Sequence, residues 1–197
     1  MPYFANFQKT GSGLFRFDTR IYLNDSALPR TSDVCVAAIV GKNPGSATVK
    51  PGGTNQLARL TLGKDKMLPT VRNVFRRAYS IAGKNAPEGA YVIVWNLFYL
   101  CEPNLPQAIC AYRKMASSLQ CPTENSLRPG IVWYAWGPSH PILNTLKGRF
   151  NRPAHVSFFY DYRAKVLQSQ IPSVTDLAKH PQGLKMSRIE PFLASIL

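Results

Sequence analysis

One stretch, residues 33–48, restricts the possible folds more than any other part of the chain. Residues 34–40 form an almost unbroken apolar run rich in β-branched side chains, which is typical of a strand buried on both faces of a parallel sheet. The run ends in residues 41–46, where two glycines and a proline exclude helix and strand and let backbone N–H groups approach a ligand closely. Ligands bind at the carboxyl ends of strands in such sheets, so we expect the chemistry of this protein in this loop.

Three further apolar runs, at 91–97, 131–136 and 154–160, are each short enough to be a strand. Residues 70–82, which lie between the first apolar run and the one at 91–97, have one apolar and one basic face, which predicts a helix that ends at Gly83. Further helices are expected at 105–119, from 139 to 150, and at 187–196. This alternation predicts an α/β fold, a three-layer sandwich around a central, mainly parallel four-stranded sheet.

Two segments fall outside that regular pattern. Residues 14–23 have interrupted alternation and aromatic side chains, which indicates an antiparallel extension at a sheet edge. We therefore expect a single domain, with an α/β body at 31–197 and residues 1–30 as an extension packed on it. Residues 49–66 are polar, contain three glycines and no aromatic residue, and are expected to form a functional loop or lid.

The charge of the chain indicates its class of partner. There are 24 Lys and Arg residues against 10 Asp and Glu residues, which gives a formal net charge of +14. Such an excess is what neutralisation of DNA or RNA phosphates requires, although a basic surface that serves only solubility is the alternative. Residues 42–84 are rich in Lys and Arg and contain Asp65 as their one acidic residue, which favours a nucleic-acid footprint beside the proposed site.

The cysteines and the hydropathy pattern exclude other classes. Cys35, Cys101, Cys110 and Cys121 form no C-x-x-C pair, so the sequence gives little support for zinc or an iron–sulfur cluster, and we expect free, mostly buried thiols. The chain has no apolar run of about 18 residues, which argues against a membrane span. The first residues lack the layout of a secretory signal, so we expect a cytoplasmic protein.

Each polar motif is weak when it is taken alone. Asn43 stands in a common turn sequence, Asn96 at a strand end could satisfy backbone groups, and His180 before a proline is usually an exposed loop residue. Ser139, after a strand that ends in Trp-Gly, is a plausible helix cap.

Their order and spacing together are more specific. The chain from about residue 34 to residue 197 resembles the uracil-DNA glycosylase superfamily, especially its mismatch-specific (Mug-like) branch, and also a related group of uncharacterised bacterial proteins. Residues 41–45, GKNPG, match the G-x-N-P-G motif that positions the attacking water in that branch. Residues 94–97, 133–137 and 180–184 match the strand end with a base-reading asparagine, the strand that ends in Trp-Gly, and the H/N-P-S-x-L segment.

The resemblance implies a monofunctional DNA glycosylase, which flips a target base into a pocket and hydrolyses its N-glycosidic bond to leave an abasic site. Asn43 would hold the attacking water, His180 would stabilise charge on the departing base, and Asn96 would read the base edge. Leu184 would fill the vacated stack, the alternative being a leucine that packs on its own domain. The other implied site residues are Gly41, Lys42 and Pro44 around the base, and Ser46, Ser139, Gly183, Lys185 and Arg188 on the DNA backbone. The resemblance implies no metal and no cofactor. The expected partner is double- or single-stranded DNA, and the protein is expected to be a monomer that is associated with the nucleoid when it is bound to DNA.

The chain departs from the family pattern at three points, which bear on the substrate. No aromatic residue follows the first motif before Phe75, residues 49–66 form an insertion, and Gln182 stands where the family has serine. A roomier pocket follows, which favours a mismatched or bulky modified pyrimidine, such as a phage-type modified cytosine, over plain uracil. Two other functions stay open: a non-catalytic DNA-binding module on the same fold, and an N-glycosidase or transferase of free nucleosides.

Overall fold

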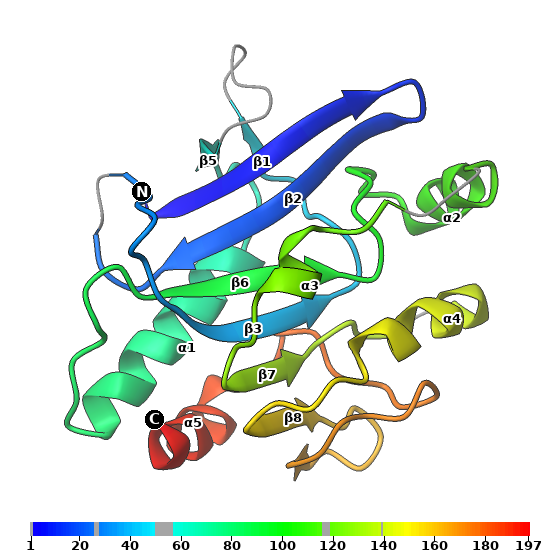
Figure 1. Cartoon of the computed structure of the whole chain (residues 1–197). Coiled ribbons are helices and arrows are strands. Elements are labelled where there is room, and N and C mark those ends of the chain that lie inside the picture. The colour runs from blue at the N-terminus through cyan, green and yellow to red at the C-terminus, as the bar shows by residue number, and fades with distance from the viewer. Residues whose placement is uncertain (1, 26–27, 50–56, 116–118, 139) are drawn as a thin grey trace.

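The computed structural model (Figure 1) describes residues 2–25, 28–49, 57–115, 119–138 and 140–197. The strands of this part of the chain are β1 (Tyr3–Thr10), β2 (Gly13–Tyr22), β3 (Cys35–Gly41), β4 (Thr48–Val49), β5 (Ala58–Thr61), β6 (Tyr91–Asn96), β7 (Ile131–Tyr134), β8 (Val156–Tyr160) and β9 (Leu167–Gln168). The helices are α1 (Met67–Ile81), α2 (Leu105–Arg113), α3 (Thr123–Ser126), α4 (Asn144–Lys147) and α5 (Glu190–Ile196), with 3₁₀ turns at Pro141–Leu143, Gly148–Phe150 and Met186–Arg188.

The strands form one mixed sheet in the order β4-β5-β1-β2-β6-β3-β7-β8-β9. The four expected strands are β6, β3, β7 and β8, and they are adjacent and parallel to one another. The expectation of a four-stranded, mainly parallel sheet is corrected, because antiparallel strands extend the sheet on both sides of these four.

The N-terminal residues are part of this sheet. β1 and β2 form an antiparallel hairpin, and β2 pairs with β6 from Thr19 opposite Val94 to Tyr22 opposite Tyr91. Residues 14–23 were expected at a sheet edge, but β1 and β5 continue the sheet beyond them. The hairpin is held there by its buried phenylalanines, so residues 3–22 are part of the sheet instead of packing on its outside.

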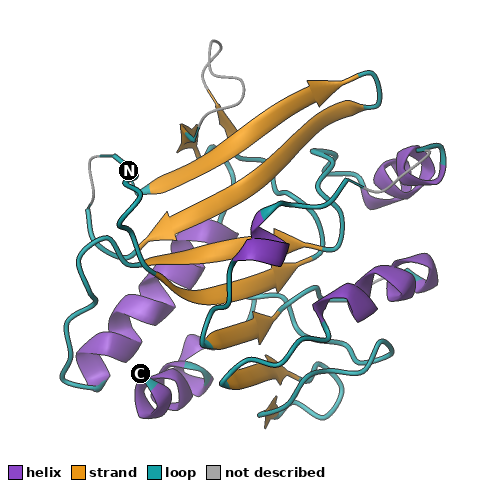
Figure 2. Cartoon of the chain, in the orientation of Figure 1, coloured by secondary structure: helices purple, strands orange, loops and turns teal. Residues whose placement is uncertain are grey.

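Helices cover both faces of the sheet, as Figure 2 shows. The apolar face of α1, including Val71, Val74 and Phe75, packs with α5 into one core. A second core lies on the other face, beneath α2, α3 and α4, and includes Trp95 and Phe150. The architecture is therefore α/β, with helices in layers on either side of a single sheet.

The predicted helices differ from the observed ones mainly at their ends. α1 begins earlier than expected, at Met67, because Asp65 accepts hydrogen bonds from the N–H groups of Met67 and Leu68. α2 ends at Arg113, and the last part of the expected helix, residues 116–118, lies outside the described residues. The helix expected to end at 150 is instead a succession of short turns around α4.

The carboxyl ends of the parallel strands meet at one edge of the sheet. Gly41 at the end of β3 is opposite Asn96 at the end of β6. The chain beyond the strands stays bound there: the N–H of Leu97 donates to the carbonyl of Gly41 at 3.0 Å, and the N–H of Gly137 donates to Ala178 at 2.6 Å. This edge brings together loops that are far apart in the sequence.

Candidate functional site

A cavity of about 250 Å³ opens at this edge of the sheet. Asn43, Pro44 and Ser46 from the loop after β3 line it together with His180 and Gln182 from the C-terminal loop. The start of α1 forms another part of its wall. Two loops that sequence reasoning assigned to one site therefore do share a cavity.

The Asn43 side chain is held firmly in this cavity. Its Nδ2 donates to the carbonyl of Glu102 at 2.9 Å and to that of Pro44 at 3.3 Å. Both bonds use the amide nitrogen, and no described residue donates to Oδ1, which leaves this oxygen as an acceptor for a bound water or a ligand.

His180 enters the cavity beside the end of β7. A Cβ atom on Gly137, which has φ +66, would lie 3.4 Å from the His180 Cβ, so the turn after β7 packs closely on this residue. The N–H of Gln182 donates to His180 Nδ1 at 3.2 Å. Burial lowers the pKa of His180, as does the nearby Lys42, while Asp65 acts in the opposite direction. The ring is therefore neutral at pH 7, and with Nδ1 accepting a bond the proton is assigned to Nε2.

Asn96 takes a different place from the one expected. Its side chain is 1% exposed and does not line the cavity, and neither Nδ2 nor Oδ1 has a hydrogen-bond partner within the described residues. A Cβ atom on Gly41 would lie 3.0 Å from Asn96 Oδ1, so glycine permits this close approach. Asn96 thus lies beneath the loop that carries Asn43, with an amide that is buried and unpaired.

The structure explains why the first motif, residues 41–45, has a glycine at each end. Gly41 leaves room for Asn96, and a Cβ atom on Gly45 would lie 2.6 Å from Asp65 Oδ2. Pro44 is buried between them and lines the cavity. The two glycines are required for close approach of polar side chains to the backbone.

Lys42 does not line the cavity, but its charge reaches the site. Burial lowers the pKa of Lys42. Burial also lowers the pKa of His180 and of Lys147, and the charge of Lys42 adds to both of these effects. Lys147 lies over the ring of Trp136 and donates to the carbonyl of Val174 at 2.6 Å. The positive charge of Lys42 therefore acts on His180 from outside the cavity lining.

A second hollow, the basic hollow, adjoins the cavity along the C-terminal loop. It has a volume of about 340 Å³ and is lined by Lys165, Lys179, Lys185 and Arg188, with Tyr160, Tyr162, Gly183 and Leu184. Arg188 donates to the hydroxyl of Tyr160 and, at 3.2 Å, to the carbonyl of Lys165. Gly183, Lys185 and Arg188 therefore lie together, as expected of a phosphate-binding surface.

Leu184 does not have the exposure expected of a wedge. Its side chain is 8% exposed and belongs to the core beneath α1 and α5. The alternative stated for it, a leucine that packs on its own domain, is the arrangement observed, because the apolar side chain gains more from burial than from solvent.

Two further expectations concern segments that the structure describes only in part. Ser139 lies outside the described residues, as do residues 50–56 of the expected lid. The described remainder of that insertion contains β5, which pairs with β1, and Leu60 is buried in the core. Part of the insertion is therefore sheet, not loop.

Asp65 and Arg16 were missed as site residues. Asp65 lines the cavity, and its Oδ2 is buried without a partner in the described part of the chain. Arg16 on β2 is fully buried, and its Nη1 donates to the carbonyl of Ala47 at 3.1 Å. Burial lowers the pKa of Arg16, an effect that Cys101 and Asp65 oppose. The isolation of Asp65 in a basic segment could have indicated it, whereas nothing in the sequence marks Arg16.

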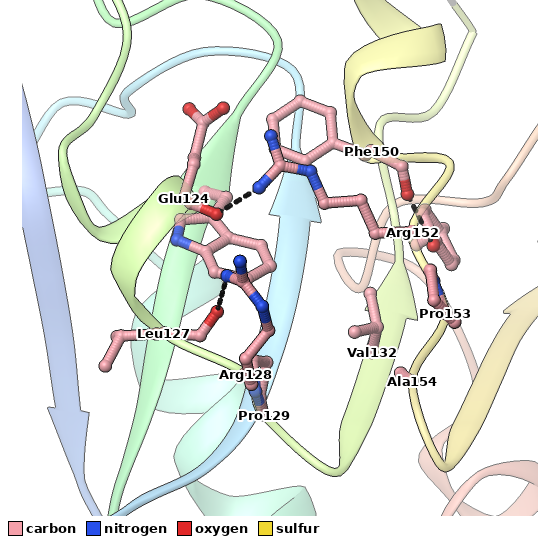
Figure 3. Close-up of a pocket in the computed structure, with 11 residues that line it drawn as sticks. Glu124, Leu127, Arg128, Pro129, Val132, Phe150, Arg152, Pro153 and Ala154 are labelled. Carbon is pink, nitrogen blue, oxygen red and sulfur yellow. Dashed lines mark hydrogen bonds between the residues drawn. The ribbon is translucent and has the colours of Figure 1, made fainter.

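Figure 3 shows another hollow, on the face of the sheet covered by α3. Trp95, Val132 and Phe150 line it, and Arg152 at its wall donates to the carbonyl of Glu124. It shares no lining residue with the cavity around Asn43. Its volume of about 30 Å³ gives room for little more than a water molecule.

Comparisons with protein-family models, with curated proteins and with solved structures found no match. Within the described residues, no helix has the length and apolar character needed to cross a bilayer. The same part of the chain contains no group of three or more His, Cys, Asp or Glu residues that could hold a metal ion. The site itself is therefore the basis for any functional conclusion.

Proposed function

We propose that this chain is a DNA glycosylase, which flips a modified or mismatched pyrimidine out of DNA and hydrolyses the bond between base and sugar. The observation that carries the proposal is the shared cavity, in which Asn43 and His180 meet from opposite ends of the sequence. Its volume of about 250 Å³ lies near the lower end of ligand pockets, roughly 300 Å³, and fits a single base better than a whole nucleotide.

The topology supports the resemblance to uracil-DNA glycosylases. The loops with the matched motifs follow β3, β6 and β7, and the fourth motif lies against the turn after β7. Ligands of open α/β sheets bind at this carboxyl edge. A glycosylase-like arrangement accounts for the first motif and for His180 of the fourth, which share the cavity, whereas Asn96 and Leu184 are buried outside the roles expected of them.

The chemistry follows from the groups that are free to act. Oδ1 of Asn43 accepts a hydrogen bond from a water, whose oxygen then faces the sugar carbon. As the bond to the base breaks, negative charge develops on the base, and the neutral His180 donates from Nε2 to it. The positive charge of Lys42 lies near enough to stabilise the same developing charge.

The basic hollow supplies a surface for the DNA backbone. Lys185 and Arg188 line it beside the C-terminal loop that carries His180. Cationic side chains bind phosphates without reading sequence, and the net charge of +14 favours a partner of this kind over a free nucleoside. Ser46, which is exposed at the cavity, is in position to contact a phosphate near the flipped base.

The test is a panel of duplex and single-stranded DNAs that carry uracil, mismatched thymine or bulky modified cytosines, assayed for abasic sites by alkaline cleavage. We expect wild type to act on at least one of them, and Asn43→Ala to lower the single-turnover rate on the order of 10²-fold or more while DNA binding is retained. Asn151→Ala, at an exposed position, is the matched control and should keep the wild-type rate.

Two results would contradict the proposal. Binding of every DNA with no abasic site formed would favour the non-catalytic DNA-binding module. Release of base from free nucleosides but from no DNA would favour the nucleoside N-glycosidase. An unchanged rate in Asn43→Ala, with wild type active, would remove Asn43 from the mechanism.

A further inference from the structure

The carboxylate of Asp65 has two oxygens with different surroundings. Oδ1 accepts hydrogen bonds from the N–H groups of Met67 at 2.9 Å and Leu68 at 3.2 Å, and so caps α1. Oδ2 is buried and has no hydrogen-bond partner among the described residues, although the side chain lines the cavity. A helix cap needs one acceptor, so the cap does not explain the second oxygen.

The direction of Oδ2 is known from its neighbour in the first motif. A Cβ atom on Gly45 would lie 2.6 Å from Oδ2, so this oxygen faces the backbone that follows Asn43 and Pro44. Asn43 presents its own free acceptor, Oδ1, to the same cavity. Because Oδ2 is buried in the free protein, a water that donates one proton to it and the other to Asn43 Oδ1 must enter from the cavity on the side of Gly45, and it then turns a lone pair of its oxygen toward a substrate.

Basic side chains lie around Asp65. Arg16, fully buried beneath the loop, is close enough for Asp65 to affect its titration, and Lys64 and Lys66 line the cavity on either side of Asp65 in the sequence. An asparagine can position a water but cannot take its proton. A carboxylate can do so, and proton transfer of this kind contributes about 10²–10⁴-fold to a rate.

We propose that Asp65 is the general base of the glycosylase reaction, an inference that rests on the function proposed above. Its Oδ2 takes a proton from the water that Asn43 holds, and the water oxygen forms a bond to the sugar C1′. The bond between C1′ and the base nitrogen breaks, and its electron pair leaves with the base. The base then takes a proton from solvent and Asp65 releases one, so the sum is hydrolysis.

The decisive variant is Asp65→Asn, which keeps the shape and the acceptor that caps α1 but removes the basic oxygen. On the best substrate of the panel, we expect its single-turnover rate to fall about 10²–10⁴-fold, with unchanged DNA binding and thermal stability. The remaining rate should rise with hydroxide concentration, because water is then deprotonated by solvent, a pH profile that a purely structural role would not produce. Asp65→Ser, which also caps a helix, should show the same loss if Asp65→Asn fails to fold.

The matched control is Asp33→Asn. Asp33 also accepts a backbone N–H, that of Arg30 at 2.6 Å, but precedes the amino end of β3, away from the cavity. It should keep the wild-type rate and pH profile.

The two proposals fail in different ways. If wild type releases base and the folded Asp65→Asn or Asp65→Ser variant is within about threefold of it, the role of Asp65 is wrong and the glycosylase stands. If wild type leaves every base of the panel in place, the proposed function is wrong and the role of Asp65 with it.

Discussion

Two groups of buried polar side chains lie near the carboxyl end of β6, and they differ in how far their hydrogen bonds are satisfied. In the first group, Arg149 pairs with Glu124 at 2.7 Å, Tyr99 bonds to the same carboxylate, and Arg149 also donates to the carbonyl of Asn96 at 2.9 Å. In the second group, next to the cavity, the amide of Asn96, Oδ2 of Asp65 and two nitrogens of Arg16 have no partner within the described residues.

The difference indicates what each group is for. A buried polar group without a partner costs about 1–3 kcal/mol, so the second group lowers the stability of the free protein. Glu124 and Arg149 instead fasten the backbone at the end of β6, where both Asn96 and Leu97 accept from Arg149. The first group is therefore structural, whereas the second leaves buried polar atoms unpaired beside the proposed site.

The largest expected effect is on the structural group. Arg149→Met should lower the free energy of unfolding by about 3–5 kcal/mol, because it leaves the charge of Glu124 buried and unpaired. Urea denaturation measures this loss. The control is Arg30→Met, which removes an ion pair whose side chains are 70% and 89% exposed and should change stability by about 1 kcal/mol or less. Equal losses in the two variants would contradict the assignment.

The second prediction concerns Asn96 of the second group, where removal of polar atoms should not lower the free energy of unfolding. Asn96→Leu keeps the branched shape and removes two unpaired polar atoms, so the free energy of unfolding should stay the same or rise, by up to about 1–3 kcal/mol. Asn104, whose Oδ1 accepts from the N–H of Gln107 at 3.1 Å, is the matched control, and Asn104→Leu should lose about 0.5–2 kcal/mol. A comparable loss of stability in both variants would mean that Asn96 is satisfied in the folded protein.

The sequence predicts the parallel core of this fold well, and the reason is physical. Strands buried on both faces must be continuous apolar runs, and β3, β6, β7 and β8 are found within a few residues of their expected positions. The strand β1 escaped prediction because its mixed polar and apolar residues carry no such signal before the partner strands are known. Its place in the sheet depends on pairing with β2 in a hairpin and with β5, which lies in the insertion.

The candidate site is less predictable than the sheet, because the role of each of its side chains depends on whether that side chain is buried or exposed in the fold. The motif around Asn43 and the histidine at 180 are visible as residue types at a spacing. Whether Leu184 is a wedge or a core residue depends on how the C-terminal loop packs against α1 and α5. In the structure Leu184 is buried in the core that these helices cover. Asp65 has one oxygen without a partner in the described part of the chain because its side chain caps α1 and also packs against Gly45, two contacts that no local sequence pattern reveals.

The smallest expected effect concerns His180, which shares the cavity with Asp65 of the second group. Burial and the charge of Lys42 lower the pKa of His180 in the folded protein, and Asp65 offsets this only in part. The unfolded chain, with an ordinary histidine pKa of about 6.5, then binds a proton before the folded protein does. Stability should therefore be complete above pH 6.5, fall as the pH drops toward the lowered pKa, and level off below it with respect to this group. Urea denaturation at pH 8, 7, 6 and 5 measures the fall, and His180→Gln should reduce it, while the same change at the exposed His155 serves as the control. If His180→Gln loses stability with acid as steeply as wild type does, then the cavity does not hold this imidazole in its neutral form, and the donor role of Nε2 would have to be given up.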